Sequence, residues 1–302
     1  MNSVNPRSRP NLAWQSKLVL LLVLPFAGVS LVLQTHWWAT YSHSVALWNL
    51  SLSLLLGVVV LELRAATMAA AAVGVVITAN LMFSTVGFPY RAWQTALIPV
   101  LTVSLLAHCA TRIGRAKKER LGTAEEKHGR SASQVAANLG IAALVSDQMT
   151  QSWLASAPWL PRAAFPPAHL IALGLAALAE AAADTVSSEL GQVFGGHPRM
   201  ITTLRTAEPG TDGAISLAGT LAGIVAAAIV AALGTLALSG DSTIFAVSCA
   251  GGVFGLLFDS LLGATIERRG LLNNDAVNFL STASAAAFAL GVLAALPYLG
   301  VK

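Results

Sequence analysis

The chain has 302 residues, of which 55% are hydrophobic and only 11% are charged. Soluble domains carry about 25% charged residues, so this composition excludes a soluble enzyme, a secreted disulfide scaffold and a disordered chain. The formal net charge is +4. In a membrane protein, excess Lys and Arg mark cytoplasmic loops that face anionic lipid, so we expect the lipid bilayer as a partner and no nucleic acid.

Nine apolar segments have roughly the 20-residue length of a helix that crosses a bilayer. They lie near residues 18–34, 45–61, 65–86, 95–110, 132–150, 168–187, 214–238, 244–264 and 276–298, and the second and fourth are among the shorter ones. The segments are rich in Ala, Leu and Gly and lack the alternation of a membrane barrel. We therefore expect an all-α, polytopic transmembrane helix bundle of about nine spans.

The basic residues predict the orientation of these segments. If the N-terminus is cytoplasmic, 15 of the 18 Lys and Arg residues face the cytoplasm. These are Arg7, Arg9, Lys17, Arg64, Arg112, Arg115, Lys117, Lys118, Arg120, Lys127, Arg130, Arg199, Arg205, Arg268 and Arg269, and the exceptions are Arg91, Arg162 and Lys302. This bias predicts a multi-pass cell-membrane protein with a cytoplasmic N-terminus.

Polar residues inside the segments are concentrated in the second part of the chain. Residues 1–128 are expected to form about four scaffold spans and a basic cytoplasmic loop, and residues 129–302 a motif-bearing helical core of about five spans. We expect both parts to form one integrated membrane domain. Asp147, near the end of the fifth segment, has no role in this scheme.

Acidic residues in the sixth and eighth segments give the strongest functional signal. Glu180, Asp184 and Ser188 recur every fourth residue, on one helix face. Asp259 lies in a stripe of glycines at the same spacing, which favours close helix packing. A buried carboxylate in a membrane needs a cation, a partner or water. The alternative is an acid that only reaches the interface.

The predicted topology brings Asp184 and Asp259 to the cytoplasmic ends of their helices. Two carboxylates, completed by water and phosphate oxygens, are typical of Mg²⁺. We therefore expect the two acids to share this ion, with the active site on the cytoplasmic side.

The segment between the sixth and seventh spans carries groups suited to phosphate. Arg199 and Arg205 offer forked donors, and the glycines before the seventh helix can expose backbone N–H groups. The residues expected to contribute hydroxyl or backbone donors are Thr202, Thr203, Gly210, Thr211, Gly213 and Ser216. An ordinary turn, with Thr211 or Asp212 as the helix cap, explains the same pattern.

Three asparagines are expected at the same depth. Asn138 and Asn278 either contact a ligand or join helices, and Asn274 either contacts a ligand or caps its helix, as Asp275 also could. No phosphate-binding loop with the Walker pattern and no nucleophile elbow is present in the sequence. A nucleotide would therefore bind at the cytoplasmic mouth of the helix bundle.

Five ordered motifs together resemble one known family. They are Ala183–Gly191, Pro198–Thr203, Gly210–Gly213 followed by Ser216, Asp259–Thr265 and Asn273–Asn278. These motifs are similar to those of the integral membrane family called domain of unknown function 92. That family includes the plant phytyl-phosphate kinase of vitamin E synthesis and animal transmembrane protein nineteen.

The resemblance implies a membrane phosphotransferase of isoprenoid metabolism. It would phosphorylate a prenyl or phytyl monophosphate to the diphosphate, with Mg²⁺ as cofactor and a nucleoside triphosphate, CTP being one candidate, as co-substrate. The expected catalytic residues are Asp184, Asp259, Arg199 and Arg205, and the expected metal ligands are Asp184, Asp259 and Glu189. The expected substrate or nucleotide contacts are Glu180, Ser187, Glu189, Thr202, Thr203, Gly210, Thr211, Asp212, Gly213, Ser216, Asn138, Asn274 and Asn278.

A membrane transporter or lipid flippase is the alternative, because polar residues inside spans also line transport paths. That class predicts acids spread through the bilayer midplane and an inverted repeat. The acids of this chain cluster toward one face instead, which favours the enzyme.

Overall fold

The computed structural model of the chain describes residues 12–124, 129–157 and 166–299, and this part is almost entirely helical. It contains α1 (Ala13–Tyr41), α2 (His43–Glu62), α3 (Met68–Ser84), α4 (Leu97–Arg112), α5 (Arg115–Leu121), α6 (Ala132–Ser146), α7 (Gln148–Ser156), α8 (Ile171–Phe194), α9 (Leu217–Ala237), α10 (Ser242–Leu262) and α11 (Asn274–Ala295). The predicted all-α, polytopic membrane fold is confirmed. Arg7, Arg9, Lys127, Arg162 and Lys302 lie outside the described residues.

Short elements join the long helices. These are η1 (Ala92–Gln94), η2 (Pro167–Leu170), η3 (Gly263–Glu267), η4 (Leu296–Leu299), β1 (Arg199–Met200) and β2 (Ala214–Ile215). The two strands pair antiparallel, with Arg199 opposite Ile215 and Met200 opposite Ala214. They close the loop between α8 and α9 into a hairpin.

Each of the nine apolar segments contains a helix, but the helices differ in length. Six described helices are long and apolar enough to cross a membrane, and α4 with α5, bent by 66°, would add a seventh. The apolar helices α3 and α6 have only 17 and 15 residues. Of the two segments expected to be short, the second contains the 20-residue helix α2 and the fourth contains the 16-residue helix α4.

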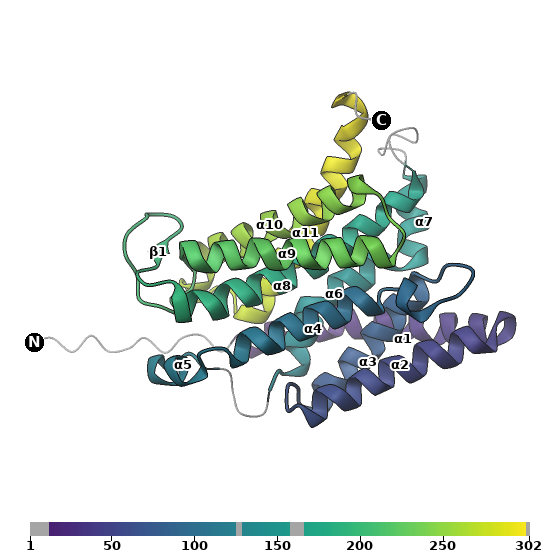
Figure 1. The fold of residues 1–302 in the computed structure, drawn as a ribbon, viewed down its shortest axis with the longest axis horizontal. Coiled ribbons are helices and arrows are strands. Elements are labelled where there is room, and N and C mark those ends of the chain that lie inside the picture. Colours follow the sequence, from purple (N-terminus) through teal and green to yellow (C-terminus); the bar gives the residue numbers. More distant parts are fainter. Residues whose placement is uncertain (1–11, 125–128, 158–165, 300–302) are drawn as a thin grey trace, which may run out of the picture.

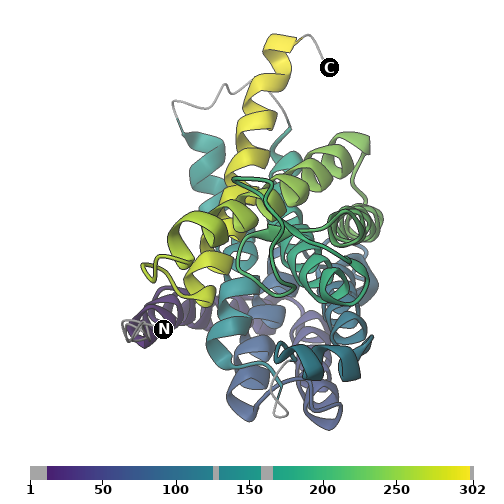
Figure 2. The same cartoon turned by 90° about the vertical axis from the view of Figure 1, so that its left-hand side faces the viewer.

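The polar connections gather at one end of the molecule. In Figure 1, α5 and the β1 segment lie at the left-hand end, near the start of α1, and α7 lies toward the opposite end. Figure 2 turns the polar end toward the reader. The candidate functional residues on α8, α10 and the hairpin therefore share one end of the bundle.

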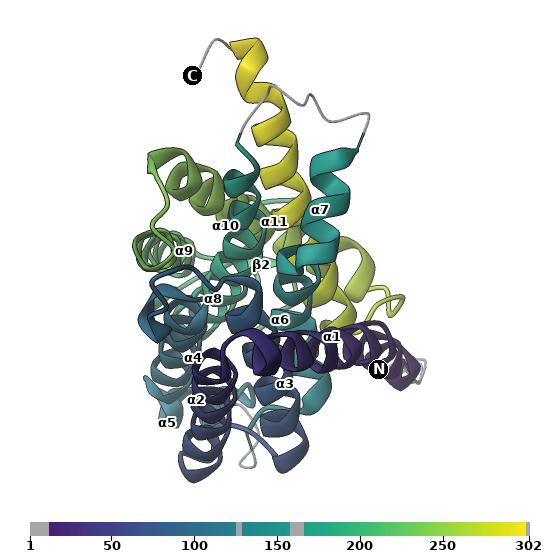
Figure 3. The ribbon, with the colours of Figure 1, turned by 90° about the vertical axis from the view of Figure 1, so that its right-hand side faces the viewer.

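Helix α8 forms the centre of the bundle, and residues 172–183 are all buried. It packs against α4, α6, α9, α10 and α11. Figure 3 shows α1, α2 and α3 on one side of it and α9, α10 and α11 on the other. Small residues permit this packing, since a Cβ at Gly252 would lie 2.7 Å from the Cβ of Ala179.

Asp147 divides the fifth predicted segment into two helices. It follows the last residue of α6, and its Oδ1 accepts a hydrogen bond of 2.9 Å from the Met149 N–H at the start of α7. Its Oδ2 accepts from the Ser30 hydroxyl at 2.5 Å. This acid, which had no role in the sequence analysis, caps a helix and anchors α1.

The helix caps considered as alternatives for two helices lie elsewhere in the structure. Helix α9 is capped by Ser216, whose hydroxyl accepts from the Gly219 N–H at 3.1 Å, and not by Thr211 or Asp212. Helix α11 is capped by Asn273, which precedes Asn274. Thr211 and Asp212 are therefore not used by the helix that follows them.

The start of α1 is hydrogen-bonded to the connection before α11. The Gln15 Nε2 donates to the Leu271 carbonyl at 2.9 Å, and the Asn273 N–H donates to the Gln15 Oε1 at 2.8 Å. Next to this pair, the Ser16 hydroxyl donates to the Asp275 Oδ2 at 2.6 Å. The first and last long helices are therefore joined at the polar end.

Candidate functional site

Two carboxyl groups meet between α8 and α10. Asp184 of α8 and Asp259 of α10 line the same cavity and are close enough to interact electrostatically. Glu180, one turn earlier on α8, is only 1% exposed and lies beside Gly255 of α10. A Cβ at Gly255 would lie 2.4 Å from the Glu180 Cγ, so the glycine stripe is what allows α10 to approach the acids.

Several oxygens of this acidic cluster have no partner. Among the described residues, neither carboxylate oxygen of Glu180 has a hydrogen-bond donor, nor has the Asp259 Oδ2. The nearby Ser281 hydroxyl donates instead to the Asn278 carbonyl, at 3.0 Å. Buried polar atoms are almost always hydrogen-bonded, so these oxygens mark a place for a proton, a water molecule or a ligand.

The Asp184–Asp259 pair faces a cavity of about 150 Å³, which we call the carboxylate cavity. Of the residues expected to act or to bind, those that line it are Asp184, Ser187, Gly210, Thr211, Asp212, Gly213, Ser216, Asp259 and Asn274. They come from the end of α8, the hairpin loop, the end of α10 and the start of α11. The structure therefore brings four separate motifs to one small polar space.

Gly213 fastens the hairpin loop over the end of α10. Its φ of +73° lies in the left-handed region, and a Cβ there would lie 2.2 Å from the Ala264 backbone nitrogen. Its carbonyl accepts a hydrogen bond of 3.1 Å from the Ile201 N–H. Only glycine combines this conformation with such a close approach, so Gly213 fixes one wall of the carboxylate cavity.

The two expected phosphate-binding arginines do not line this cavity. Arg199 is exposed, and its Nη1 donates to the Leu204 carbonyl at 3.0 Å within the same loop. Arg205, Thr202 and Thr203 are also exposed. In the structure these side chains lie on the surface of the hairpin, away from Asp184 and Asp259.

Glu189 is directed away from the carboxylate cavity. It forms an ion pair with the Nζ of Lys118 on α5, and Thr111 donates to its Oε1 at 3.4 Å. The Lys118 side chain is buried, so its charge requires this partner. The structure thus gives the expected metal ligand a structural partner: Glu189 is near enough to act electrostatically on Asp184, but it does not line the carboxylate cavity.

Asn138 and Asn278 are buried and also lie outside the lining of the carboxylate cavity. The Asn138 Nδ2 donates to the Gln134 carbonyl at 2.8 Å, within the first turn of α6. The Asn278 carbonyl accepts from Ser281 and Thr282, within the first turns of α11. The structure does not bring these two asparagines to the paired acids.

Arg130 lies beside the acidic cluster, although the sequence indicated it only as one of the cytoplasmic basic residues. Its Nη2 donates to the Thr185 hydroxyl at 3.2 Å, and its charge acts on the neighbouring Asp184. Its backbone is held by the connection between α2 and α3: the Arg130 N–H donates to the Ala65 carbonyl, and the Thr67 N–H donates to the Arg130 carbonyl, both at 3.0 Å. The available signal was a glycine, Gly129, directly before a basic residue at the start of a helix.

Metal binding by the acidic cluster stays a prediction. In the described part of the chain, no group of three or more His, Cys, Asp or Glu side chains is arranged to hold a metal ion. Two carboxylates with water and ligand phosphate oxygens are nevertheless a normal Mg²⁺ environment. The Asp184–Asp259 pair and its unpartnered Oδ2 fit that chemistry.

Comparison with known proteins gives several relatives. The chain is 48% identical over 108 residues to an uncharacterized membrane protein of Methanocaldococcus jannaschii, a match that covers 36% of this chain and 45% of the relative. It is 31% identical over 211 residues to an uncharacterized membrane protein of Synechocystis, a match that covers 66% of this chain and 74% of the relative. It is 28% identical over 197 residues to the Arabidopsis thaliana protein named "Protein VTE6, chloroplastic", covering 64% and 57%.

No solved structure matches the chain significantly. The model of the family described as "Integral membrane protein DUF92" matches residues 51–286, which include every residue of the carboxylate cavity. The match spans more than half of the chain, and the chain therefore belongs to the DUF92 family of integral membrane proteins.

Proposed function

We propose that the protein is a membrane-embedded phosphotransferase of isoprenoid metabolism. It would convert a prenyl or phytyl monophosphate to the diphosphate, with a nucleoside triphosphate as donor, CTP being one candidate. The Asp184–Asp259 pair facing the carboxylate cavity is the observation that carries the proposal. The similarity to the Arabidopsis relative and the family motifs, which resemble those of phytyl-phosphate kinase, support it.

The proposed reaction needs positioning and charge neutralisation more than covalent chemistry. An oxygen of the lipid monophosphate forms a bond to the γ-phosphorus of the donor. The bond from that phosphorus to its bridging oxygen breaks, and the nucleoside diphosphate leaves with the electron pair. The acceptor is already anionic, so no strong base has to remove a proton.

The residues of the carboxylate cavity divide these tasks. Asp184 and Asp259 would hold Mg²⁺, which when bound supplies positive charge to the phosphate oxygens. Arg130 would neutralise charge beside Asp184 through its guanidinium. Thr211 and Ser187, which line the same cavity, would donate hydroxyl hydrogen bonds. From the predicted distribution of basic residues, we propose that this takes place on the cytoplasmic side.

A direct assay tests the proposal. Purified protein is incubated with Mg²⁺, with each nucleoside triphosphate in turn, and with phytyl, geranylgeranyl or farnesyl monophosphate, and the lipid diphosphate is measured by mass spectrometry. We expect wild-type protein to form the diphosphate and both Asp184→Asn and Asp259→Asn to lose Mg²⁺-dependent turnover while staying folded.

Asp241→Asn provides the matched control. Asp241 lies directly before the start of α10, at the opposite end of the helix from Asp259. Its carboxylate caps the helix by accepting a 3.0 Å hydrogen bond from the Ile244 N–H, a role that asparagine also performs. This variant should keep its activity. Near-normal turnover in both Asp184→Asn and Asp259→Asn would contradict the proposed function.

A further inference from the structure

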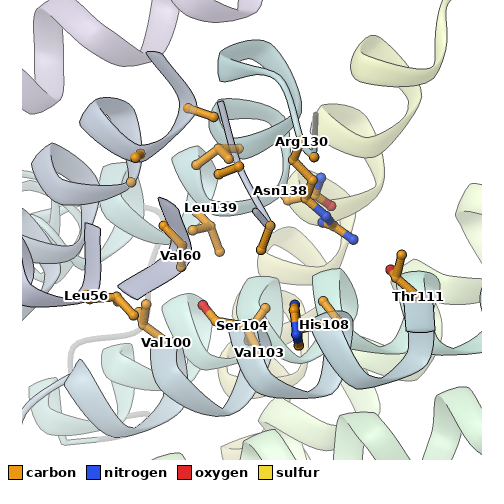
Figure 4. Close-up of a pocket in the computed structure, with 18 of the residues that line it drawn as sticks. Leu56, Val60, Val100, Val103, Ser104, His108, Thr111, Arg130, Asn138 and Leu139 are labelled. Atoms are coloured by element: carbon orange, nitrogen blue, oxygen red, sulfur yellow. The ribbon is translucent and has the colours of Figure 1, made fainter. Parts of the chain in front are cut away.

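A second cavity, of about 390 Å³, lies between α2, α3, α4 and α6. Its size is within the usual range for small-molecule sites, about 300–1,000 Å³. Figure 4 shows Leu56 and Val100 at one end and Arg130 and Thr111 at the other. We call it the arginine cavity, because four arginines line its polar end: Arg64, Arg112, Arg115 and Arg130.

Polarity changes steadily along the wall that α4 contributes. Val100 and Val103 line the apolar end, and Ser104, His108 and Thr111, with Ala107 among them, line the cavity toward the polar end, all from one helix (Figure 4). At 1.5 Å of rise per residue, Val100 and Thr111 are about 16 Å apart along the axis. This gradient matches an elongated amphiphile with one apolar end and one polar end.

The acidic partners of two of these arginines lie outside the lining of the cavity: Arg115 pairs with Glu119 at 3.0 Å, and Arg130 lies near Asp184. Among the described residues, no Asp or Glu lines the cavity, although four arginines do. Arg112 donates through Nη2 to the Leu63 carbonyl at 3.0 Å, and Arg115 donates through Nε to Glu119 at 3.0 Å. A guanidinium has five N–H donors, so both side chains keep donors for an anion. A phosphate group matches these forked donors.

The two cavities meet at Arg130 and helix α8. Arg130 lines the arginine cavity and also donates to the Thr185 hydroxyl, next to Asp184. Ala181 lines the arginine cavity, and Asp184, which lines the carboxylate cavity, follows three residues later, about 4.5 Å along the helix axis. A phosphate at the polar end would therefore lie next to the paired acids.

We propose that the arginine cavity binds a single-chain lipid monophosphate. The chain lies among the apolar residues of α2, α3 and α4, and the phosphate lies at the arginines, with Arg130 between it and the carboxylate cavity. This inference rests on the proposed function, because it assigns the acceptor substrate to this cavity and leaves the transferred phosphate of the nucleotide to the carboxylate cavity.

Binding without nucleotide tests the site separately from the reaction. The full-length protein in lipid nanodiscs is titrated calorimetrically with geranylgeranyl monophosphate. The comparison ligands are geranylgeraniol, inorganic phosphate and phosphatidic acid. We expect geranylgeranyl monophosphate to bind at least about tenfold more tightly than each of the other three, a difference of about 1.4 kcal/mol.

Variants at the polar end test the arginines. Arg112→Gln and Arg115→Gln should each weaken binding of geranylgeranyl monophosphate about tenfold or more. The matched control is Arg120→Gln, because Arg120 is exposed on the same helix as Arg115 but does not line the cavity. Equal affinity in all three variants and wild type would overturn the proposal.

A variant at the apolar end gives a result that misfolding would not produce. Gly74 lines the cavity, and a Cβ there would meet only the Val135 Cγ1, at 3.9 Å, so we expect the longer side chain of Gly74→Leu to extend into the cavity and fill part of it. It should weaken binding of the C20 chain while keeping that of geranyl monophosphate. The control is Gly291→Leu, because Gly291 does not line the cavity and a Cβ there would meet no atom within 4 Å.

The outcomes separate this inference from the proposed function. If the ligand binds with the expected pattern but no diphosphate forms, the proposed function fails and the binding site stands. If diphosphate forms while the cavity variants bind and react normally, the proposed site is wrong. Equal binding of phosphatidic acid, or of inorganic phosphate alone, would likewise overturn the single-chain lipid assignment.

Discussion

Lys118 shows how a charged side chain is accommodated beside the membrane bundle. It is 1% exposed, and its Nζ donates to the carbonyls of Ala110 and Thr111 at 3.0 and 2.7 Å and to the Glu189 carboxylate. All three ammonium donors are therefore used. The ion pair joins α5 to α8 and fixes the direction of the Glu189 side chain.

We predict that Glu189→Gln destabilises the protein by about 3–5 kcal/mol, because Lys118 would stay buried without its counter-charge. Lys118→Met combined with Glu189→Gln removes both charges and should restore most of the loss. Thermal unfolding in detergent measures both effects. If the double variant is folded but inactive, the interpretation of Glu189 as a metal ligand is supported. If it is folded and active, the structural role of Glu189 is supported.

A second residue-scale prediction separates the arginines. Lysine keeps the charge of arginine but loses its forked geometry. We expect Arg130→Lys to lower kcat/KM about tenfold or more, which corresponds to about 1.4 kcal/mol of transition-state stabilisation. Arg199→Lys should change it little, because Arg199 is bonded within its own loop. The opposite ranking would show that the hairpin arginines move onto phosphate when substrate binds.

The sequence predicts only part of this site. The meeting of Asp184 and Asp259 was predictable, because the four-residue spacing of acids and glycines identifies helix faces that can approach closely. The partners of Glu189 and Arg130 were not, because they are 71 and 55 residues away along the chain. Such pairs depend on tertiary packing, which no local pattern encodes. Metal binding by the two acids stays a prediction.

At the scale of elements, the hairpin loop between α8 and α9 contains three glycines with positive φ, and two of them, Gly196 and Gly213, differ in their surroundings. Gly213 has a φ of +73° and touches Ala264, whereas Gly196 has a φ of +60° and would have no atom within 4 Å of an added Cβ. An alanine at either position would strain the backbone, but only an alanine at position 213 would also meet a close neighbour. Only Gly213 holds the loop against α10.

We expect Gly213→Ala to raise the KM for the nucleotide about tenfold, because the loop must move away from α10 and open the carboxylate cavity. Gly196→Ala carries a similar conformational cost but should leave KM unchanged. Steady-state kinetics at saturating lipid phosphate provide the comparison. Similar KM values for both variants would mean that the position of the loop does not control nucleotide binding.

Element boundaries were less predictable than element type. The composition of each apolar segment indicates a helix, and each one contains a helix. Asp147 nevertheless ends α6 within the fifth segment, because its carboxylate caps α7 and accepts from Ser30. Likewise, α9, the helix of the seventh segment, begins after Ser216 because the Ser216 hydroxyl caps it. Hydropathy averages over about 20 residues and does not resolve a single cap.

At the scale of the whole molecule, hydrogen bonds between helix ends constrain the number of crossings. Residues joined near helix ends lie on the same membrane face, so an even number of crossings separates them. Ala65 and Arg130 are joined across α3 and α4, and Lys118 and Glu189 across α6 and α8. If α4 and α8 cross the membrane, we expect the short helices α3 and α6 to cross as well, and the count of nine spans stays a prediction.

We predict the sidedness from the basic residues. In a background with Cys109→Ala and Cys249→Ala, a cysteine placed at Thr206 should react with an impermeant maleimide only from the cytoplasmic side. A cysteine at Ser239, which is exposed between α9 and α10, should react only from outside. Right-side-out and inverted vesicles give the two measurements. Labelling of position 206 from outside would separate the candidate site from the cytoplasmic nucleotide pool.

The bonds between the start of α1 and the connection before α11 set an order of events during synthesis. Gln15 and Asn273 are 258 residues apart. At roughly 5–20 residues per second, the ribosome needs roughly 13–52 s to make the second partner after the first. Throughout that interval the first helix is already made but lacks its final contacts. Docking of the start of α1 is therefore one of the last steps of assembly, and a nascent chain that stops before residue 271 would leave this corner of the bundle open.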